Sequence, residues 1–168
     1  MEILDVDLVA FERGSRDAAR AVVDGLMRSL GSGFVYVRHD VPEEVVDAAY
    51  ELLGTFFHLP REAKERAIVP GSMGQTGYTG LLVETAAGAA RADWKEMLNW
   101  GRELPDRHPL RQRYPHRYMP RVLGEESVPG ISAALGLLWD RFEDVQRRCL
   151  RVIATGLGAH RDFFDGLL

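Results

Sequence analysis

The sequence lacks the features that would place a protein in a membrane or outside the cell. Its single cysteine, Cys149, cannot form an internal disulfide bond. No apolar run approaches the roughly 18 residues that a membrane-spanning helix needs. The N-terminal segment carries Asp5 and Asp7 and has neither the basic nor the apolar part of a signal peptide. These absences predict a soluble, cytoplasmic protein that does not contact a membrane.

Lysine is also scarce, since Lys64 and Lys95 are the only two lysines among 21 basic residues. The preference for arginine indicates a GC-rich, bacterial genome. The 25 acidic residues give a net charge of −4, which argues against a nucleic-acid partner. Segment 102–121 combines six arginines with Tyr114 and Tyr118, but it is rich in proline. We interpret this segment as an exposed connection that could lend one arginine to an anionic ligand.

The hydrophobic pattern predicts an α+β protein with long helices and few strands. Apolar residues three and four apart predict helices that begin at Ser15 or Asp17, at Pro42 and at Gly130. Alternation and β-branched residues predict only three strands. The expected elements are strands 3–9, 34–37 and 93–100, helices 15–30, 42–57, 60–66 and 130–155, a glycine-rich loop 70–80, an extended connection 101–121, and a helix that starts at 162.

The end of the sequence carries apolar residues with no evident packing partner, namely Phe163, Phe164, Leu167 and Leu168. Three strands are also too few to form a well-covered sheet under helices of this length. Both observations predict that the chain is the front part of a larger domain.

Two short motifs point to chemistry only weakly. His160 and Asp162 form an H-x-D pair, which supplies two ligands of a 2-His-1-carboxylate iron site when both lie on a strand. Here the pair falls between two helices, so a surface histidine beside a helix-capping Asp162 is the favoured alternative. A kinase catalytic loop is excluded because the following leucine is missing.

The glycines of loop 70–80 lack the Gly-Lys-Ser/Thr of a phosphate-binding loop, and the spacing of the other histidines matches no zinc site.

Several segments, taken in order, resemble a known family. The chain contains GFVYVRHD, then FFHLPREAKER, then GYTG and DWKEMLNWG. This set resembles the N-terminal region of the isopenicillin N synthase-like iron(II)/2-oxoglutarate-dependent dioxygenases over residues 3–168. The matching positions are Gly33, Phe34, Val37, His39, Phe56, Phe57, Leu59, Pro60, Glu62, Lys64, Gly77 and Tyr78. Asp40 departs from the pattern, because the family usually has glycine there.

The resemblance implies the fold and the chemistry of the whole protein. Such enzymes build a double-stranded β-helix, or jelly roll, and place their iron and 2-oxoglutarate ligands in its second half. Residues 1–168 would therefore be the N-terminal region, with the catalytic core after Leu168. No metal or catalytic residue can be assigned within this chain, and the fragment alone is expected to be inactive. The implied partner is the missing C-terminal half, and the implied cofactors are Fe(II) and 2-oxoglutarate.

The implied activity is the hydroxylation, desaturation or cyclisation of a small-molecule metabolite. The layout of residues 74–101 is similar to that of bacterial members in antibiotic biosynthesis, which favours secondary metabolism. A non-catalytic binding module, one half of a split enzyme, and an unrelated helical interaction protein remain alternatives. A reading frame that continues into an H-x-D and a distal histidine would favour the enzyme.

We expect the substrate wall in strand 93–100 and the residues before it. Alternation puts Lys95, Met97 and Asn99 on one face, and Trp94, Glu96, Leu98 and Trp100 on the other. The two tryptophans and Leu98 are the better core face, provided that Glu96 reaches a partner or the edge. Lys95, Met97 and Asn99 are then expected to face the ligand, with Tyr78 closing one side through its ring and a free hydroxyl. Ordinary packing or surface exposure is the alternative for each of the four.

Overall fold

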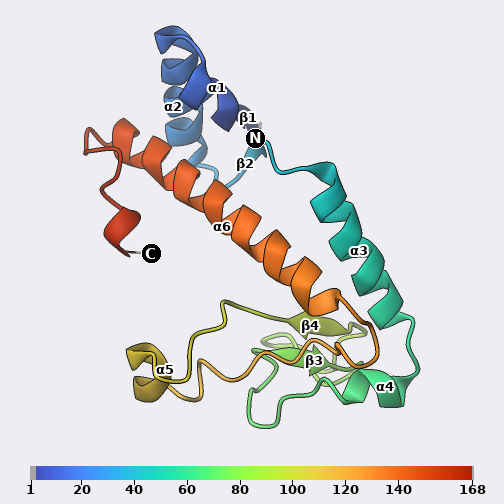
Figure 1. The fold of residues 1–168 in the computed structure, drawn as a ribbon. Helices are drawn as coiled ribbons and strands as arrows, with labels where there is room; N and C mark the ends of the chain where they lie inside the picture. Colours follow the sequence, from blue (N-terminus) through green and yellow to red (C-terminus); the bar gives the residue numbers. More distant parts are fainter. Residues whose placement is uncertain (1–2, 168) are drawn as a thin grey trace. The chain divides into compact units, whose positions relative to one another are not determined.

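The computed structural model describes residues 3–167, which form two compact units (Figure 1). Unit 1 contains the chain up to Pro42 and again from Asp140, and unit 2 contains Glu43–Trp139. The boundary falls inside helix α6 (Ile131–Gly156), so this helix contributes residues to both units. Within residues 3–167, no helix is long and apolar enough to cross a membrane.

Unit 1 begins with strand β1 (Leu4–Asp7), helix α1 (Leu8–Arg13) and helix α2 (Arg16–Ser29), and continues to strand β2 (Val35–Arg38). Strands β1 and β2 pair in parallel, with Leu4 opposite Val35. The predicted strand 3–9 is therefore too long. It ends at Asp7, whose carboxylate accepts a hydrogen bond from Ala10 N and caps α1. Ser15 caps α2 in the same way, as the sequence predicts.

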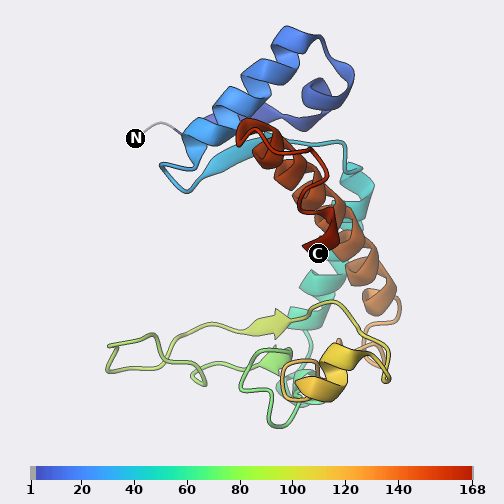
Figure 2. The ribbon, with the colours of Figure 1, turned by 90° about the vertical axis from the view of Figure 1, so that its left-hand side faces the viewer.

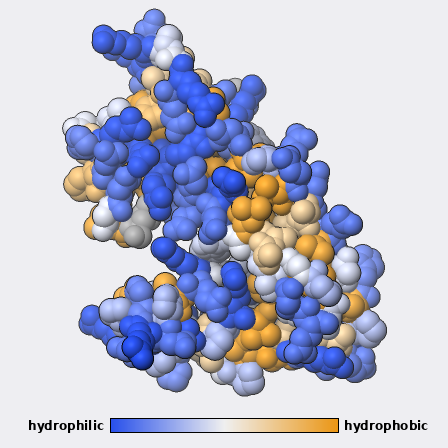
Figure 3. Space-filling view, in the orientation of Figure 1, coloured by the Kyte–Doolittle hydropathy of each residue, from blue (hydrophilic) through white to orange (hydrophobic). Residues whose placement is uncertain are grey.

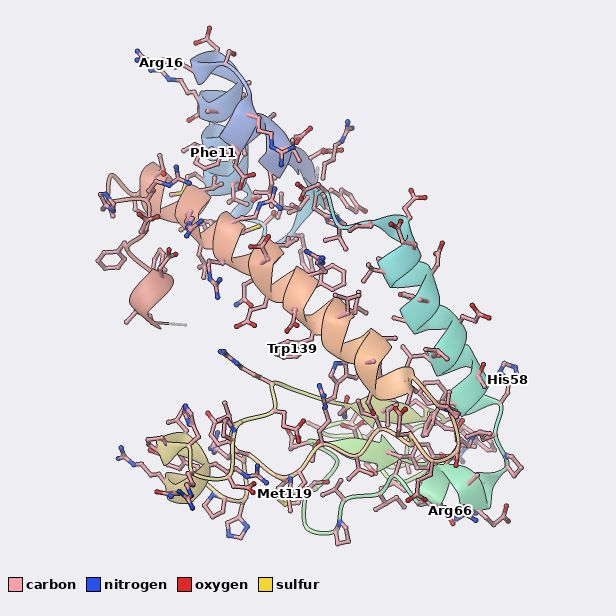
Figure 4. The ribbon with its side chains drawn as sticks, in the orientation of Figure 1. Phe11, Arg16, His58, Arg66, Met119 and Trp139 are labelled. Carbon is pink, nitrogen blue, oxygen red and sulfur yellow. The ribbon has the colours of Figure 1, made fainter. Side chains whose placement is uncertain are left out.

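The core of unit 1 joins both ends of the chain. Helix α6 packs its second half against β1, α1 and α2, and the buried residues of this cluster are Val6, Leu8, Val22, Leu26, Val145 and Val152. The visible face over α1 and α2 is mostly hydrophilic (Figure 3). Phe11 lies on α1 and Arg16 at the start of α2 (Figure 4). The amphipathic patterns of α2 and α6 thus bury one face each, as predicted.

Asp40, which departs from the family pattern, takes part in an ion-pair cluster of unit 1 that surrounds one buried arginine. Arg148 of α6 is 8% exposed and donates to Asp40 Oδ1 at 2.5 Å and to Glu12 Oε1 at 2.8 Å. The hydrogen bond from Arg148 holds the pKa of Asp40 below its ordinary value. The aspartate therefore neutralises a buried guanidinium, which a glycine could not do.

Unit 2 contains helices α3 (Glu43–Phe57) and α4 (Arg61–Glu65), strands β3 (Gly77–Thr79) and β4 (Met97–Asn99), helix α5 (Pro109–Arg113) and the start of α6. Its core packs α3 against the β3–β4 pair and the first turns of α6. The buried members of this core are Ala49, Phe56, Ala67, Tyr78, Leu98, Leu123, Val128, Ile131, Leu135 and Leu138. The predicted helices over 42–57, 60–66 and 130–155 are confirmed.

Several sequence expectations for unit 2 are wrong in detail. The predicted strand 93–100 pairs only over Met97–Asn99, and Trp94 is 79% exposed instead of packing in the core. The chain between β3 and β4 extends away from the rest of the unit as an arm (Figure 2). The predicted loop 70–80 contains β3, and connection 101–121 contains α5, whose start has Pro109 and a capping His108. Residues 3–167 thus hold four strands, paired in two two-stranded sheets, where three were predicted.

The C-terminal segment differs from the helix predicted to start at 162. It forms a single 3₁₀ turn, η1 (Asp165–Leu167). Phe163 is 59% and Leu167 is 75% exposed, so these apolar side chains lack cover within the described residues. Leu168, predicted to belong to the same apolar set, lies outside the described residues.

Candidate functional site

A cavity of about 600 Å³ lies in unit 2, between the β3–β4 pair and the glycine-rich loop before β3. Its walls come from residues 68–69 after α4, loop 70–76, β3, β4 and the start of the arm. Side chains that line it include Ile68, Met73, Tyr78, Thr79, Met97 and Asn99. Apolar side chains also reach the surface of unit 2 (Figure 3). A concave, mainly apolar space with a few polar groups is the usual form of a small-molecule site.

The pairing of β3 with β4 decides which side chains share the cavity face. The strands are antiparallel, with Thr79 opposite Met97 and Gly77 opposite Asn99. Residues directly opposite each other on paired strands project to the same face, and the residues next to them in each strand project to the opposite face. Thr79, Met97 and Asn99 therefore lie on the cavity face. Leu98 belongs to the core on the opposite face, and the ring of Tyr78 packs in the same core while Tyr78 also borders the cavity.

Two glycines allow the loop to fold against β4. Gly74 has a φ of +75°, and its carbonyl oxygen accepts a hydrogen bond from Asn99 Nδ2 at 2.7 Å. Gly77 has a φ of +77°, and a Cβ there would overlap the carbonyl oxygen of Ala67. Left-handed φ values of this kind favour glycine. The loop and Asn99 thus hold each other in place at the cavity.

Beneath the sheet, Glu96 joins α4 to β3 through a half-buried polar cluster. Its Oε1 lies 2.5 Å from Lys64 Nζ and also accepts a hydrogen bond from the Tyr78 hydroxyl. Lys64 Nζ further donates to Phe57 O at 3.1 Å, at the end of α3. This cluster anchors the residue that precedes β4, and so fixes where Met97 and Asn99 begin.

The protonation of this cluster follows from its contacts. Burial, followed by the hydrogen bond to Glu96, raises the pKa of Tyr78 to about 12. The hydrogen bond from Lys64, followed by that from Tyr78, lowers the pKa of Glu96. Near pH 7, Glu96 is therefore a carboxylate and Tyr78 a neutral donor. The cluster carries no free acid or base for catalysis.

Comparison with known proteins assigns the chain. The family described as "non-haem dioxygenase in morphine synthesis N-terminal" matches residues 3–122, which is most of the chain. The chain belongs to this family. The resemblance seen in the sequence, and its restriction to the N-terminal region, are therefore confirmed.

The chain resembles dioxygenases of this family in sequence and in structure. The 2-oxoglutarate-dependent dioxygenase frbA of Dothideomycetidae sp. is 26% identical over 96% of the chain and 49% of its own length. A 2-oxoglutarate-dependent dioxygenase of Talaromyces stipitatus, tropC, is 33% identical over 45% of the chain and 24% of its own length.

Two solved structures share the fold. A protein described as a 2OG-Fe(II) oxygenase family member from Caulobacter crescentus is 30% identical, with a TM-score of 0.80 over 97% of this chain and 51% of that one. A full-length Neurospora crassa protein solved with alpha-KG and thymine is 20% identical, with a TM-score of 0.75 over 97% of this chain and 50% of that one.

The chain thus spans about half the length of the dioxygenases that it matches over nearly all of its residues. At the level of the family, the predicted enzyme class and its cofactors, Fe(II) and 2-oxoglutarate, are confirmed. These assignments concern the family.

The structure brings three of the four predicted substrate residues to the cavity. Met97, Asn99 and Tyr78 line it, but the ring of Tyr78 packs on Phe56 and its hydroxyl is bound to Glu96 instead of being free. Lys95 lies outside the paired part of β4, where its ammonium contacts Glu84 at 2.6 Å and Asp93 at 3.3 Å. It reaches the cavity only through Glu84, which lines the rim.

Sequence reasoning missed Thr79 and Gly74 because it treated residues 70–80 as a loop. The signal that could have found Thr79 is the short alternation of Gly77, Tyr78 and Thr79, which resembles a strand once Tyr78 is taken as a core residue. Gly74 could not have been found in this way, because its contact with Asn99 spans 25 positions.

The described residues do not fit an iron ion. Within residues 3–167, no three His, Cys, Asp or Glu side chains come together in a way that could hold a metal. The side chain of His160 is 81% exposed and lies 3.7 Å from Asp162, which contacts Arg151 at 3.4 Å. His58 lies at the end of α3, at the edge of unit 2, with Nδ1 2.6 Å from Gly54 O (Figure 4). No chemical step is therefore assigned to a metal held by these residues.

Proposed function

We propose that this chain is the N-terminal part of an Fe(II)- and 2-oxoglutarate-dependent oxygenase that oxidises a small molecule. Membership of the dioxygenase family is the observation that carries the proposal. In such a reaction, 2-oxoglutarate and O₂ give succinate and CO₂, and one oxygen atom is used to oxidise the substrate. The jelly-roll core and the ligands for both cofactors would lie in the part of the protein that follows this region.

The role proposed for unit 2 is to supply one wall of the substrate site. Two features support it: the cavity is mainly apolar, and Met97 and Asn99 present a thioether and an amide to it from a paired strand. Tyr78 contributes through its ring position, because its hydroxyl is occupied by Glu96. Side chains fixed in this way would hold a substrate in one orientation and exclude water from it. Lys95 is proposed to act at the rim, by holding Glu84.

The finer proposals concern the substrate and its setting. We propose hydroxylation, desaturation or cyclisation of a metabolite in bacterial secondary metabolism, including antibiotic biosynthesis, and a cytoplasmic location. The arginine-rich composition and the likeness to a Caulobacter crescentus protein support a bacterial source. The proposed partners are the small-molecule substrate and the C-terminal half of the same fold.

The experiment is 2-oxoglutarate turnover by the intact protein, purified after expression from its own gene. Succinate formation is measured with Fe(II) and O₂, first alone and then with a panel of candidate metabolites. We expect succinate to form, to depend on Fe(II), and to rise with the metabolite that is the substrate. A protein that neither binds nor consumes 2-oxoglutarate when loaded with Fe(II) would refute the proposal.

A further inference from the structure

We propose that the unit 2 cavity recognises a neutral, mainly apolar molecule through one amide group, held by Asn99 and by Thr79. The inference deepens the proposed function, and rests on it only in taking the ligand to be a substrate. Three observations carry the argument: the fixed amide of Asn99, the unpaired hydroxyl of Thr79, and the composition of the walls.

The Asn99 amide has a defined orientation. Its partner, Gly74 O, is a carbonyl oxygen and can only accept, so the NH₂ group of the amide must face the loop. The Oδ1 atom is then turned away from the loop, and within residues 3–167 it accepts no hydrogen bond. Because Asn99 lines the cavity, this oxygen can accept an N–H from a ligand.

The Thr79 hydroxyl is the second polar group. Thr79 is 7% exposed, lines the same cavity, and has an Oγ1 without a hydrogen-bond partner in the described part of the chain. Buried hydroxyls nearly always have a hydrogen-bond partner, so an unpaired one suggests that a bound ligand supplies the partner. A Cβ at Gly74 would lie 3.1 Å from this Oγ1, which places Thr79 beside the Gly74–Asn99 contact. In our proposal, rotation about χ1 turns the hydroxyl from Gly74 to the ligand, where it donates to a carbonyl oxygen.

The remaining walls define the rest of the ligand. Apolar contacts come from Ile68, Val69, Val83 and Met97. The charged residue among the lining side chains is Glu84, which is paired with Lys95. A ligand charge would therefore find no free counter-charge in the walls, which favours a neutral molecule. Ser72, Gln75 and Thr85 also line the cavity, and the Ser72 hydroxyl already donates to Thr76 O at 3.0 Å. An amide fits Asn99 and Thr79, since its N–H faces Asn99 and its carbonyl oxygen faces Thr79.

Binding of benzamide to the intact protein tests the inference. The dissociation constant is measured by ligand-observed NMR for wild type, Thr79→Val and Thr79→Ser. Valine keeps the shape of threonine without the hydroxyl, and serine keeps the hydroxyl without the methyl group. We expect Thr79→Val to weaken binding by about three- to tenfold, the value of one hydrogen bond, and Thr79→Ser to change it less than twofold. N,N-dimethylbenzamide, which lacks the N–H, should bind about as weakly to wild type as benzamide binds to Asn99→Ala.

Urea denaturation of the same variants separates a ligand role from a structural one. An unpaired buried hydroxyl makes no favourable contribution to folding and costs its desolvation, so Thr79→Val should unfold at the same urea concentration as wild type or at a higher one. Equal benzamide binding by Thr79→Val and Thr79→Ser, no benzamide binding by wild type, or easier unfolding of Thr79→Val would each overturn the inference. Absence of 2-oxoglutarate turnover would refute the proposed function and leave this binding result in place.

Discussion

Replacing Glu96 by glutamine should destabilise the protein by about 2 kcal/mol, because it leaves the Lys64 ammonium without its anion. The Lys64 side chain is 10% exposed, and its contacts are Glu96 Oε1 at 2.5 Å and Phe57 O at 3.1 Å. Removing one partner of a wholly buried pair costs about 3–5 kcal/mol. The expected loss is smaller here, since glutamine keeps an oxygen for Lys64 and the Glu96 side chain is 21% exposed.

Urea denaturation of the intact protein measures this loss, with Glu65→Gln as the matched control. Glu65 pairs with Arg61 at 2.6 Å, but that arginine side chain is 81% exposed, so loss of the pair should change the free energy of unfolding little. Adding Lys64→Met to Glu96→Gln removes the unpaired charge and should recover stability. Unfolding of Glu96→Gln and Glu65→Gln at the same urea concentration would contradict a stabilising role of the Glu96–Lys64 pair.

The dependence of stability on pH in the acid range gives a second test of the Glu96–Lys64 pair. The pKa of Glu96 is lowered in the folded protein, first by Lys64 and then by Tyr78. The stability that the carboxylate contributes is therefore fully present above its unfolded pKa of about 4.3 and is lost as pH falls through the folded value. The gap between wild type and Glu96→Gln should close in that window, and a gap that persists under acid would contradict an ionic cause.

Three further predictions concern single positions. The pKa of Tyr78 is about 12 in the folded protein and about 10 when unfolded. Between these pH values, the free energy of unfolding of wild type should therefore fall by about 1.4 kcal/mol per pH unit. Urea denaturation of Tyr78→Phe should show no such pH dependence. Gly77→Ala should unfold far more easily than Gly88→Ala, because both have positive φ values but only the first meets Ala67 O. Arg148→Met should lower the thermal midpoint, because Glu12 and Asp40 lose the Arg148 guanidinium and Asp40 keeps Arg13 at 3.6 Å; an unchanged midpoint would show that the cluster is not stabilising.

Local sequence patterns were sufficient for the helices and for part of the site. Spacings of three and four residues set the buried faces of α2, α3 and α6: α2 packs in the core of unit 1, α3 in the core of unit 2, and α6 contributes residues to both cores. Alternation placed Met97 and Asn99 on one face and Leu98 on the other, as the pairing with β3 requires. The same alternation continues through Lys95 and Trp94, but β3 is only three residues long and offers them no partner.

Contacts between residues far apart in the sequence could not be predicted from local patterns. Asp40 and Arg148 are 108 positions apart, and neither charge pattern nor spacing links them. Glu96 was expected to need a partner, but Lys64 could not be named from the sequence, since the two lie on elements whose packing is set by the whole core. The prediction of a free Tyr78 hydroxyl was wrong for the same reason, because its contact with Glu96 also depends on the packing of the whole core.

Hydrogen exchange of the intact protein tests the central claim most directly. The compound that raises succinate formation is added to the protein loaded with Fe(II) and 2-oxoglutarate under anaerobic conditions, and amide exchange is compared with and without it. We predict slower exchange in residues 74–79 and 97–99 when the compound is present. Unchanged exchange in both segments, with protection elsewhere, would contradict the assignment of this cavity as the substrate wall.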